Sequence, residues 1–150
     1  MKKALTPSFE NFYDKIKEIL ESARNRSYMA VNFEMVQAYW NIGRSIVEEE
    51  QAGRERAEYG KYLLSNLSIR LTAEYGKGFD YRNLAYMRQF YQTFPNMNAL
   101  RSELSWTHYR ILIRVDREQA REFYLQECVE GNWSTRQLER QINSLYFERI

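Results

Sequence analysis

The sequence predicts an all-α fold on three observations. Apolar residues recur at three- and four-residue intervals along nearly the whole chain, which is the spacing of one face of an α-helix. Both prolines, Pro7 and Pro95, fall where a predicted helix begins or ends. No segment shows a clear strand pattern. We therefore expect one multi-helix domain, since 150 residues suit a single compact unit.

Residues 1–53 are expected to form a long helical hairpin, an element that commonly forms dimers. The first helix opens at Pro7 and carries an apolar stripe that includes Phe9, Phe12 and Ile16. The second helix runs from about residue 27 to residue 51 and contains Gly43. An internal glycine costs a helix roughly 1 kcal/mol relative to alanine. We therefore expect another helix to approach closely at Gly43.

Residues 54–150 are expected to form a helix-turn-helix-like bundle. Its first helix spans about residues 58–75 and is broken by the Gly76 to Phe79 segment. The next helix spans about residues 81–94, with Asp80 as its N-cap. Its polar side chains include Arg82, Asn83, Arg88 and Gln89.

The last third repeats the pattern of cap, helix and turn. Ser105 is expected to cap a helix over 106–115, and Asp116 one over 117–130. Gly131 is the expected left-handed stop. Ser134 and Gln137 form a capping box for a final helix that runs from residue 135 to the chain end. The β-branched content of residues 111–115 would also permit a strand in a small wing.

Composition excludes most enzyme classes for this chain. Cys128 and His108 are the single cysteine and histidine, so an internal disulfide or a closed zinc site is not expected. No phosphate-binding loop, dinucleotide fingerprint or nucleophile elbow occurs. We expect no catalytic residue, no metal or cofactor site and no small-molecule substrate in this chain.

No run of about 18 apolar residues occurs, so no membrane partner is expected. The first seven residues lack the apolar stretch of a signal peptide. We therefore expect a cytoplasmic protein.

The charge distribution favours a nucleic-acid partner. The formal net charge is only +2, but residues 61–114 carry eight Lys or Arg residues against three Asp or Glu residues. A basic region of this kind is what phosphate binding needs, although a solvated helical face has the same composition.

Two segments have the helix, short turn, helix plan of a DNA-reading motif, in which the second helix enters the major groove. Arginine pairs with guanine, and asparagine or glutamine with adenine. The predicted DNA contacts are therefore Arg82, Asn83, Arg88 and Gln89 first, then Arg136, Arg140 and Gln141, with Lys77 and His108 in support. The same helix, turn, helix spacing is also found wherever a helical bundle folds back.

Seven blocks resemble the N-terminal domain of the YhcG-type family, and they occur in order over nearly the whole chain. They are YWNIG at 39–43, GKGF at 76–79, RNL at 82–84, MRQFY at 87–91, LSWTHY at 104–109, AREFY at 120–124 and NWSTRQLERQI at 132–142. The resemblance implies that a C-terminal PD-(D/E)XK nuclease domain follows in cis, with Mg²⁺ required by that domain. It also implies a bacterial-type nuclease, of which some have been linked to phage defence.

The chain ends before a nuclease domain could begin, so we expect it to be the truncated N-terminal part of such a protein and not itself an enzyme. Two hypotheses follow. The first is a DNA-binding domain that forms a homodimer through its first two helices. The alternative is a protein–protein interaction or oligomerisation module that does not touch DNA.

Overall fold

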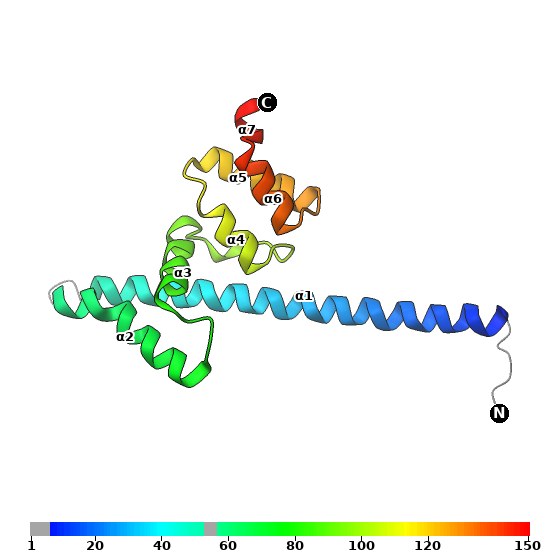
Figure 1. The fold of residues 1–150 in the computed structure, drawn as a ribbon, viewed down its shortest axis with the longest axis horizontal. Helices are drawn as coiled ribbons and strands as arrows, with labels where there is room; N and C mark the ends of the chain where they lie inside the picture. Colours follow the sequence, from blue (N-terminus) through cyan, green and yellow to red (C-terminus); the bar gives the residue numbers. More distant parts are fainter. Residues whose placement is uncertain (1–6, 53–56) are drawn as a thin grey trace.

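A computed structural model describes residues 7–52 and 57–150, and there the predicted all-α class is confirmed (Figure 1). Strands are absent from these two ranges. The elements are α1 (Pro7–Ala52), α2 (Ala57–Tyr75), α3 (Tyr81–Thr93), the 3₁₀ turn η1 (Met97–Ala99), α4 (Trp106–Leu112), α5 (Glu118–Glu130), α6 (Thr135–Asn143) and α7 (Tyr146–Arg149). None of the helices described could cross a membrane, because none combines the necessary length with sufficient apolarity.

The predicted hairpin within residues 1–53 is wrong, because α1 is one continuous helix of 46 residues. The sequence contains no glycine or proline between Pro7 and Gly43, so nothing interrupts the i to i−4 hydrogen bonds. Its N-terminal half projects from the rest of the molecule, and α2 instead folds back beside the C-terminal part of α1 (Figure 1). The predicted boundary at residue 53 and the side chain of Phe9 lie outside the described residues.

Helix α3 occupies the centre of the fold and crosses α1. Leu84, Met87 and Phe90 are buried along it. A Cβ atom added at Gly43 would lie 2.7 Å from the carbonyl carbon of Met87, and still closer to the carbonyl oxygen. The close approach expected at Gly43 is therefore confirmed, and α3 is the helix that makes it.

An aromatic cluster joins α1, α3 and α4. The rings of Phe90 and Tyr109 lie 4.9 Å apart between centroids, and those of Phe94 and Tyr109 lie 5.3 Å apart. The indole Nε1 of Trp40 donates a 2.7 Å hydrogen bond to the carbonyl of Phe94, the last turn of α3. Ring packing and this buried hydrogen bond together fix α3 against both neighbouring helices.

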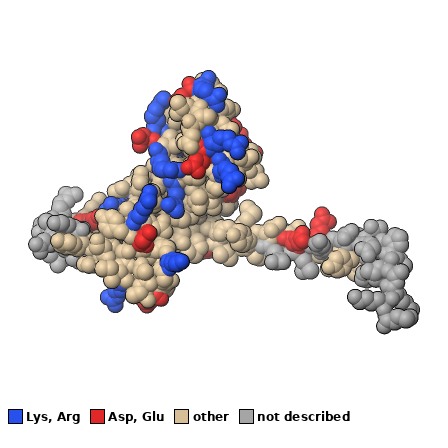
Figure 2. Space-filling view, viewed as in Figure 1, with Lys and Arg blue, Asp and Glu red and all other residues tan. Residues whose placement is uncertain are grey.

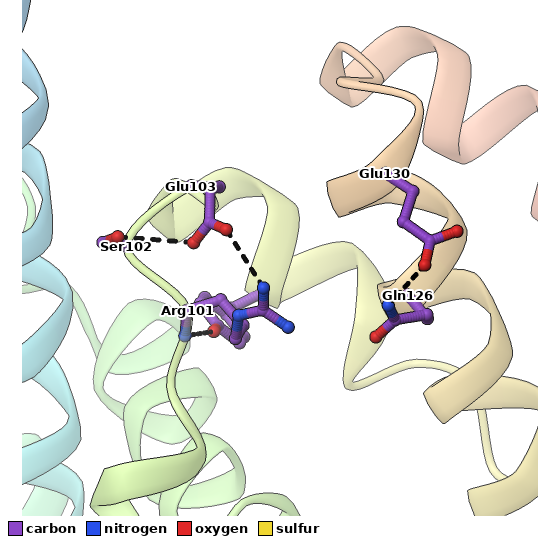
Figure 3. A network of polar contacts seen from close by, with 6 residues as sticks. Arg101, Ser102, Glu103, Gln126 and Glu130 are labelled. Carbon is purple, nitrogen blue, oxygen red and sulfur yellow. Dashed lines mark hydrogen bonds and ion pairs between the residues drawn. The ribbon is translucent and has the colours of Figure 1, made fainter.

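The loop before α4 is closed by polar contacts around Glu103 (Figure 3). The Arg101 guanidinium lies 3.0 Å from the Glu103 carboxylate, which also accepts a 3.3 Å hydrogen bond from Ser102. The Tyr109 hydroxyl accepts a 2.7 Å hydrogen bond from the Arg101 amide, and burial raises the pKa of Tyr109 to about 12. Arg101 is therefore engaged in holding its own loop.

Three predicted helix caps are confirmed. Asp80 accepts a hydrogen bond from the Asn83 amide at the start of α3. Ser105 caps α4 through the His108 amide, and Ser134 and Gln137 form the predicted capping box of α6. Each cap depends on residues within one turn of helix, which explains why local sequence is sufficient to find them.

Two predicted helix ends in this region are wrong. Arg117, not Asp116, is the N-cap of α5, and the Arg121 side chain instead donates a 2.7 Å hydrogen bond to the carbonyl of Val115 in this turn. Gly131 has a right-handed φ of −87°, and the left-handed residue is Asn132 with a φ of 50°. Asparagine is among the residues that tolerate this conformation best after glycine.

The possible wing at residues 111–115 is also wrong. Ile111 and Leu112 belong to α4 and, together with Ile113, are buried in the core. An apolar, β-branched run suits a buried helix end as well as a strand, and here core contact determines the outcome.

The final predicted helix is interrupted at Leu145, which has a left-handed φ of 58°. The short α7 that follows turns back onto α5. There the Phe147 amide donates a 3.0 Å hydrogen bond to the Tyr124 hydroxyl, and the Phe123 and Phe147 rings lie 5.1 Å apart. Contacts with α5 therefore offset the backbone cost of a left-handed leucine.

Candidate nucleic-acid interface

Five arginines from three helices form a connected surface that we call the basic strip. They are Arg82 on α3, Arg110 on α4, Arg114 in the turn that follows α4, and Arg136 and Arg140 on α6. All are exposed except Arg110, which is half-buried. Figure 2 shows basic side chains gathered on one face of the part of the molecule built by the later helices.

Tyr86 lies at the junction of α3 and α4 and joins two of these arginines. Arg82 Nε donates a 3.3 Å hydrogen bond to the Tyr86 hydroxyl. The Arg110 guanidinium lies over the ring at 4.7 Å from its centroid, which is within the range of a cation–π contact. The hydrogen bond from Arg82, with smaller effects of the positive charges of Arg82 and Arg110, lowers the pKa of Tyr86 below its usual value.

A cleft of about 200 Å³ continues the strip from α4 towards α6. It is lined by Tyr86, Thr107, Arg110, Ile111, Arg114 and Glu139. The Nε atom of Arg110 is buried and has no hydrogen-bond partner among the described residues. Arg114 lies 3.4 Å from Glu139, and both side chains are about half exposed, so solvent screens this ion pair.

Helix α6 presents the most exposed part of the strip. Leu138 is buried on its inner face, and the Ser134 capping box fixes its first turn. On the outer face, Arg136, Arg140 and Asn143 follow one another at intervals of four and three residues. Arg136, Arg140 and Asn143 also line a second, open cleft with Glu139 and Ser144. The arrangement leaves two guanidinium groups and one amide facing solvent on one side of a short helix.

Three of the predicted contacts on α3 are engaged within the molecule. Asn83 Nδ2 donates a 2.6 Å hydrogen bond to the carbonyl of Gly78. Arg88 forms a 2.6 Å ion pair with Glu50 of α1, at about 30% exposure of both side chains. Gln89 Nε2 donates a 3.2 Å hydrogen bond to the carbonyl of Ile113. These side chains hold α3 in place, and their contact with DNA stays a prediction.

His108 has a structural role at the start of α4. Its Nδ1 accepts a 3.1 Å hydrogen bond from the Ser105 amide, and its Nε2 lies 2.9 Å from the carbonyl oxygen of Trp133. Because a carbonyl can only accept, Nε2 carries the proton and the ring is satisfied on both sides. The imidazole therefore joins α4 to the turn before α6.

The remaining predicted residues lie outside the clefts of the strip. Lys77 is exposed in the turn between α2 and α3, flanked by Gly76 and Gly78 with φ angles of 83° and 107°. Gln141 is half-buried on α6. Their contact with DNA stays a prediction.

Sequence reasoning placed Arg82, Arg136 and Arg140 in the site and missed Arg110 and Arg114. Both belong to the basic region of residues 61–114, but Arg110 lies on α4 and Arg114 lies in the turn after it. Their contacts with Tyr86 and Glu139 depend on how α3, α4 and α6 pack, and no local sequence pattern predicts that packing.

The described side chains contain no group of three or more His, Cys, Asp or Glu residues that could hold a metal ion. Burial raises the pKa of the Cys128 thiol to about 11, which leaves it almost wholly protonated and a weak nucleophile at neutral pH.

The fold and the site together define an all-α domain whose charged surface is built on arginines. The chain belongs to the family of the DUF1016 N-terminal domain, which matches residues 15–149. It is 34% identical, over 176 aligned residues, to an Escherichia coli (strain K12) protein named "Putative nuclease YhcG". The resemblance to the YhcG-type family is thereby confirmed.

That alignment covers 96% of this chain and 47% of the relative, so the chain spans about half the length of the curated relative that it matches. No solved structure gives a significant match.

Proposed function

We propose that this chain is the DNA-binding N-terminal domain of a nuclease, and that the basic strip makes the contact. One observation carries the proposal. Five guanidinium groups from α3, α4, the turn after α4, and α6 line one surface, and Glu139 is the single carboxylate that lines its two clefts. A surface with this balance attracts a polyanion.

The strip offers two kinds of contact. Arg82, Arg110 and Arg114 lie beside the body of the domain, where guanidinium groups would bind backbone phosphates through paired N–H donors. Arg136, Arg140 and Asn143 project from α6, which follows α5 after a short turn. An exposed helix in that position can enter a major groove, where arginine pairs with guanine and asparagine with adenine.

Packing favours α6 over α3 as the recognition helix. Helix α3 is packed between α1, α2 and α4, and three of its polar side chains are bonded to the rest of the chain. On α6, by contrast, Leu138 is the single buried residue. A groove-binding helix must keep one whole face accessible, and α6 meets this requirement better.

The name and length of the relative support the wider proposal. A protein about twice as long and named as a nuclease suggests that a C-terminal nuclease domain follows in cis and supplies the Mg²⁺-dependent chemistry. In this proposal the present domain directs that activity to DNA in the cytoplasm.

Fluorescence anisotropy with labelled duplex, single-stranded and branched DNA at two salt concentrations tests the proposal. We expect binding that weakens steeply with salt. Replacing the exposed Arg114 and Arg140 together by alanine should weaken binding roughly 10- to 50-fold at 0.15 M salt and reduce the slope of log K against log salt by about 2, because two positive charges that face the polyanion are lost.

The matched control is Arg26→Ala with Arg44→Ala, which removes the same charge from exposed positions on α1. It should leave both the affinity and the slope unchanged. Equal losses in the two double variants would show that net charge alone matters, and an absence of binding at low salt would contradict the proposal.

The alternative function is a protein-interaction module without DNA contact. It is favoured by one specific feature, the row of exposed apolar side chains on α1. An apolar interface depends little on ionic strength, so the two-salt comparison separates the two functions.

A further inference from the structure

Helix α1 carries an exposed apolar stripe along the side that faces away from α3. Phe12 is 58% exposed, Tyr28 71% and Val31 60%. The stripe, which we call the α1 stripe, consists of Phe12, Tyr13, Ile16, Tyr28, Val31 and Met35. At 100° per residue these positions fall within about 160° of the helix circumference, while Val36, Trp40 and Gly43 lie on the opposite side. Apolar side chains are therefore exposed to solvent on two stretches, residues 12–16 and 28–35, of a helix that projects from the body (Figure 1).

The same side of α1 ends in an apolar groove. The groove has a volume of about 620 Å³ and lies between α1 and α2. Ile42 and Ile46 of α1 form one wall, and the other is a ladder on α2 at four-residue intervals, Leu63, Leu67, Leu71 and Tyr75. A ladder with this spacing is a ridge into which the side chains of another helix can pack.

We propose that the groove receives the projecting part of α1 from a second copy of this chain, and that the two copies exchange these contacts in an antiparallel dimer. An antiparallel pairing that places Phe12 against Ile46 also places Ile16 against Ile42, because both pairs are centred on residue 29. Tyr28 and Val31 then lie at the crossing point. One register therefore buries the N-terminal end and the middle of the α1 stripe.

Two-fold symmetry makes this arrangement closed. Each copy supplies one projecting helix and one groove, so the same contact occurs twice and no binding surface is left for a third copy. A second copy is thus an occupant whose exposed apolar helix matches the apolar lining of the groove. This inference does not rest on DNA binding, because the basic strip uses other residues.

The exposed area is sufficient for a stable pair. Phe12, Tyr13 and Tyr28 are between half and three-quarters exposed, and a fully buried aromatic side chain covers about 150–250 Å². Over two copies these three residues would remove roughly 500–900 Å² from water. Specific interfaces bury about 1,200–2,000 Å² in total, and the aliphatic residues of the α1 stripe and the groove supply the rest.

Sedimentation equilibrium of the 150-residue chain is the first test. We expect twice the 18.2 kDa mass of one copy. Ile16→Asp should return the mass to that of one copy, because a carboxylate would be placed against Ile42 of the partner. The matched control is Glu18→Lys, an exposed position on the other side of α1. A monomer at high micromolar concentration, or an assembly larger than a dimer, would overturn the proposal.

Cysteine cross-linking tests the register and does not depend on any variant that disturbs the groove. The native Cys128 is 1% exposed and has a raised pKa, so an introduced thiol reacts first. In the proposed dimer the two copies of Tyr28 are about 3 Å apart along the axis, and the two copies of Ile16 about 39 Å apart.

Tyr28→Cys should therefore cross-link to itself with a short bifunctional reagent. Ile16→Cys alone should not, whereas Ile16→Cys combined with Ile42→Cys should. Cross-linking of Ile16→Cys to itself would reveal a parallel pair and overturn the proposal. Circular dichroism of each variant confirms that the helices are retained.

Discussion

Gly43 controls how closely α1 and α3 cross. A side chain at this position would meet the backbone of Met87, and the backbone cannot move aside as a flexible side chain can. We expect Gly43→Ala to lower the free energy of unfolding by about 1–3 kcal/mol, even though alanine is the better helix former, because overpacking outweighs a propensity gain of about 1 kcal/mol. Urea denaturation followed by circular dichroism measures this change.

Ser45→Ala is the control for helix propensity. Ser45 is exposed on the same turn of α1, so its replacement should leave stability unchanged or raise it by about 0.5 kcal/mol. Equal behaviour of the two variants would contradict the close approach of α1 and α3.

At this scale the sequence predicted residues whose partners are local. Asp80 and Ser134 cap helices through amides three positions away, and both were found. Arg88 was predicted to contact DNA, but its side chain pairs with Glu50, 38 residues earlier. The bonding partner of a long polar side chain depends on the residues that the fold brings near it. No local sequence pattern contains that information.

The capping box of α6 links the stability of one element to the proposed DNA contact. Ser134 Oγ accepts a 3.1 Å hydrogen bond from the Gln137 amide, and the Gln137 side-chain oxygen accepts a hydrogen bond from the Ser134 amide. Ser134→Ala should lower the free energy of unfolding by about 1 kcal/mol. It should also weaken DNA binding, because Arg136 lies in the turn that loses its cap. Thermal denaturation and anisotropy measure the two effects.

Ser134→Thr provides the rescue, because threonine keeps the accepting hydroxyl. It should restore most of both quantities. An unchanged stability in Ser134→Ala would mean that the cap contributes nothing to α6, and a restored stability without restored DNA binding would separate the cap from the interface.

Helix number and boundaries followed from the sequence where glycine, proline or a cap marks them. Between residues 8 and 42 no such marker exists, and the predicted start of a second helix near residue 27 lies inside the continuous α1. Similarly, α3 and α6 have equally suitable polar residues in the sequence. Burial distinguishes them, since α3 has three buried residues and α6 has one.

Over the whole molecule, two surfaces of different chemistry lie on different helices. The basic strip belongs to α3, α4 and α6, and the α1 stripe and its groove belong to α1 and α2. The family resemblance supplied the context of a nuclease, but neither the basic strip nor the groove could be predicted from it, because each is assembled from residues far apart in the chain.

The unbroken course of α1 has a consequence for its length. In a continuous helix every added residue advances the projecting part by about 1.5 Å and also rotates it by about 100°. Seven residues inserted after Asn25 would rotate the outer part of the α1 stripe by only about 20°, whereas five would rotate it by about 140° and turn Phe12 and Ile16 away from the side that carries Ile42. We expect the seven-residue insertion to retain the two-copy mass in sedimentation equilibrium and the five-residue insertion to lose it. If both insertions behaved alike, the direction in which the stripe faces would be irrelevant to assembly. In the proposed dimer, changes in the length of α1 are therefore constrained to steps near whole numbers of helical turns. The length of α1 determines the direction in which the α1 stripe faces as well as the distance to which it projects.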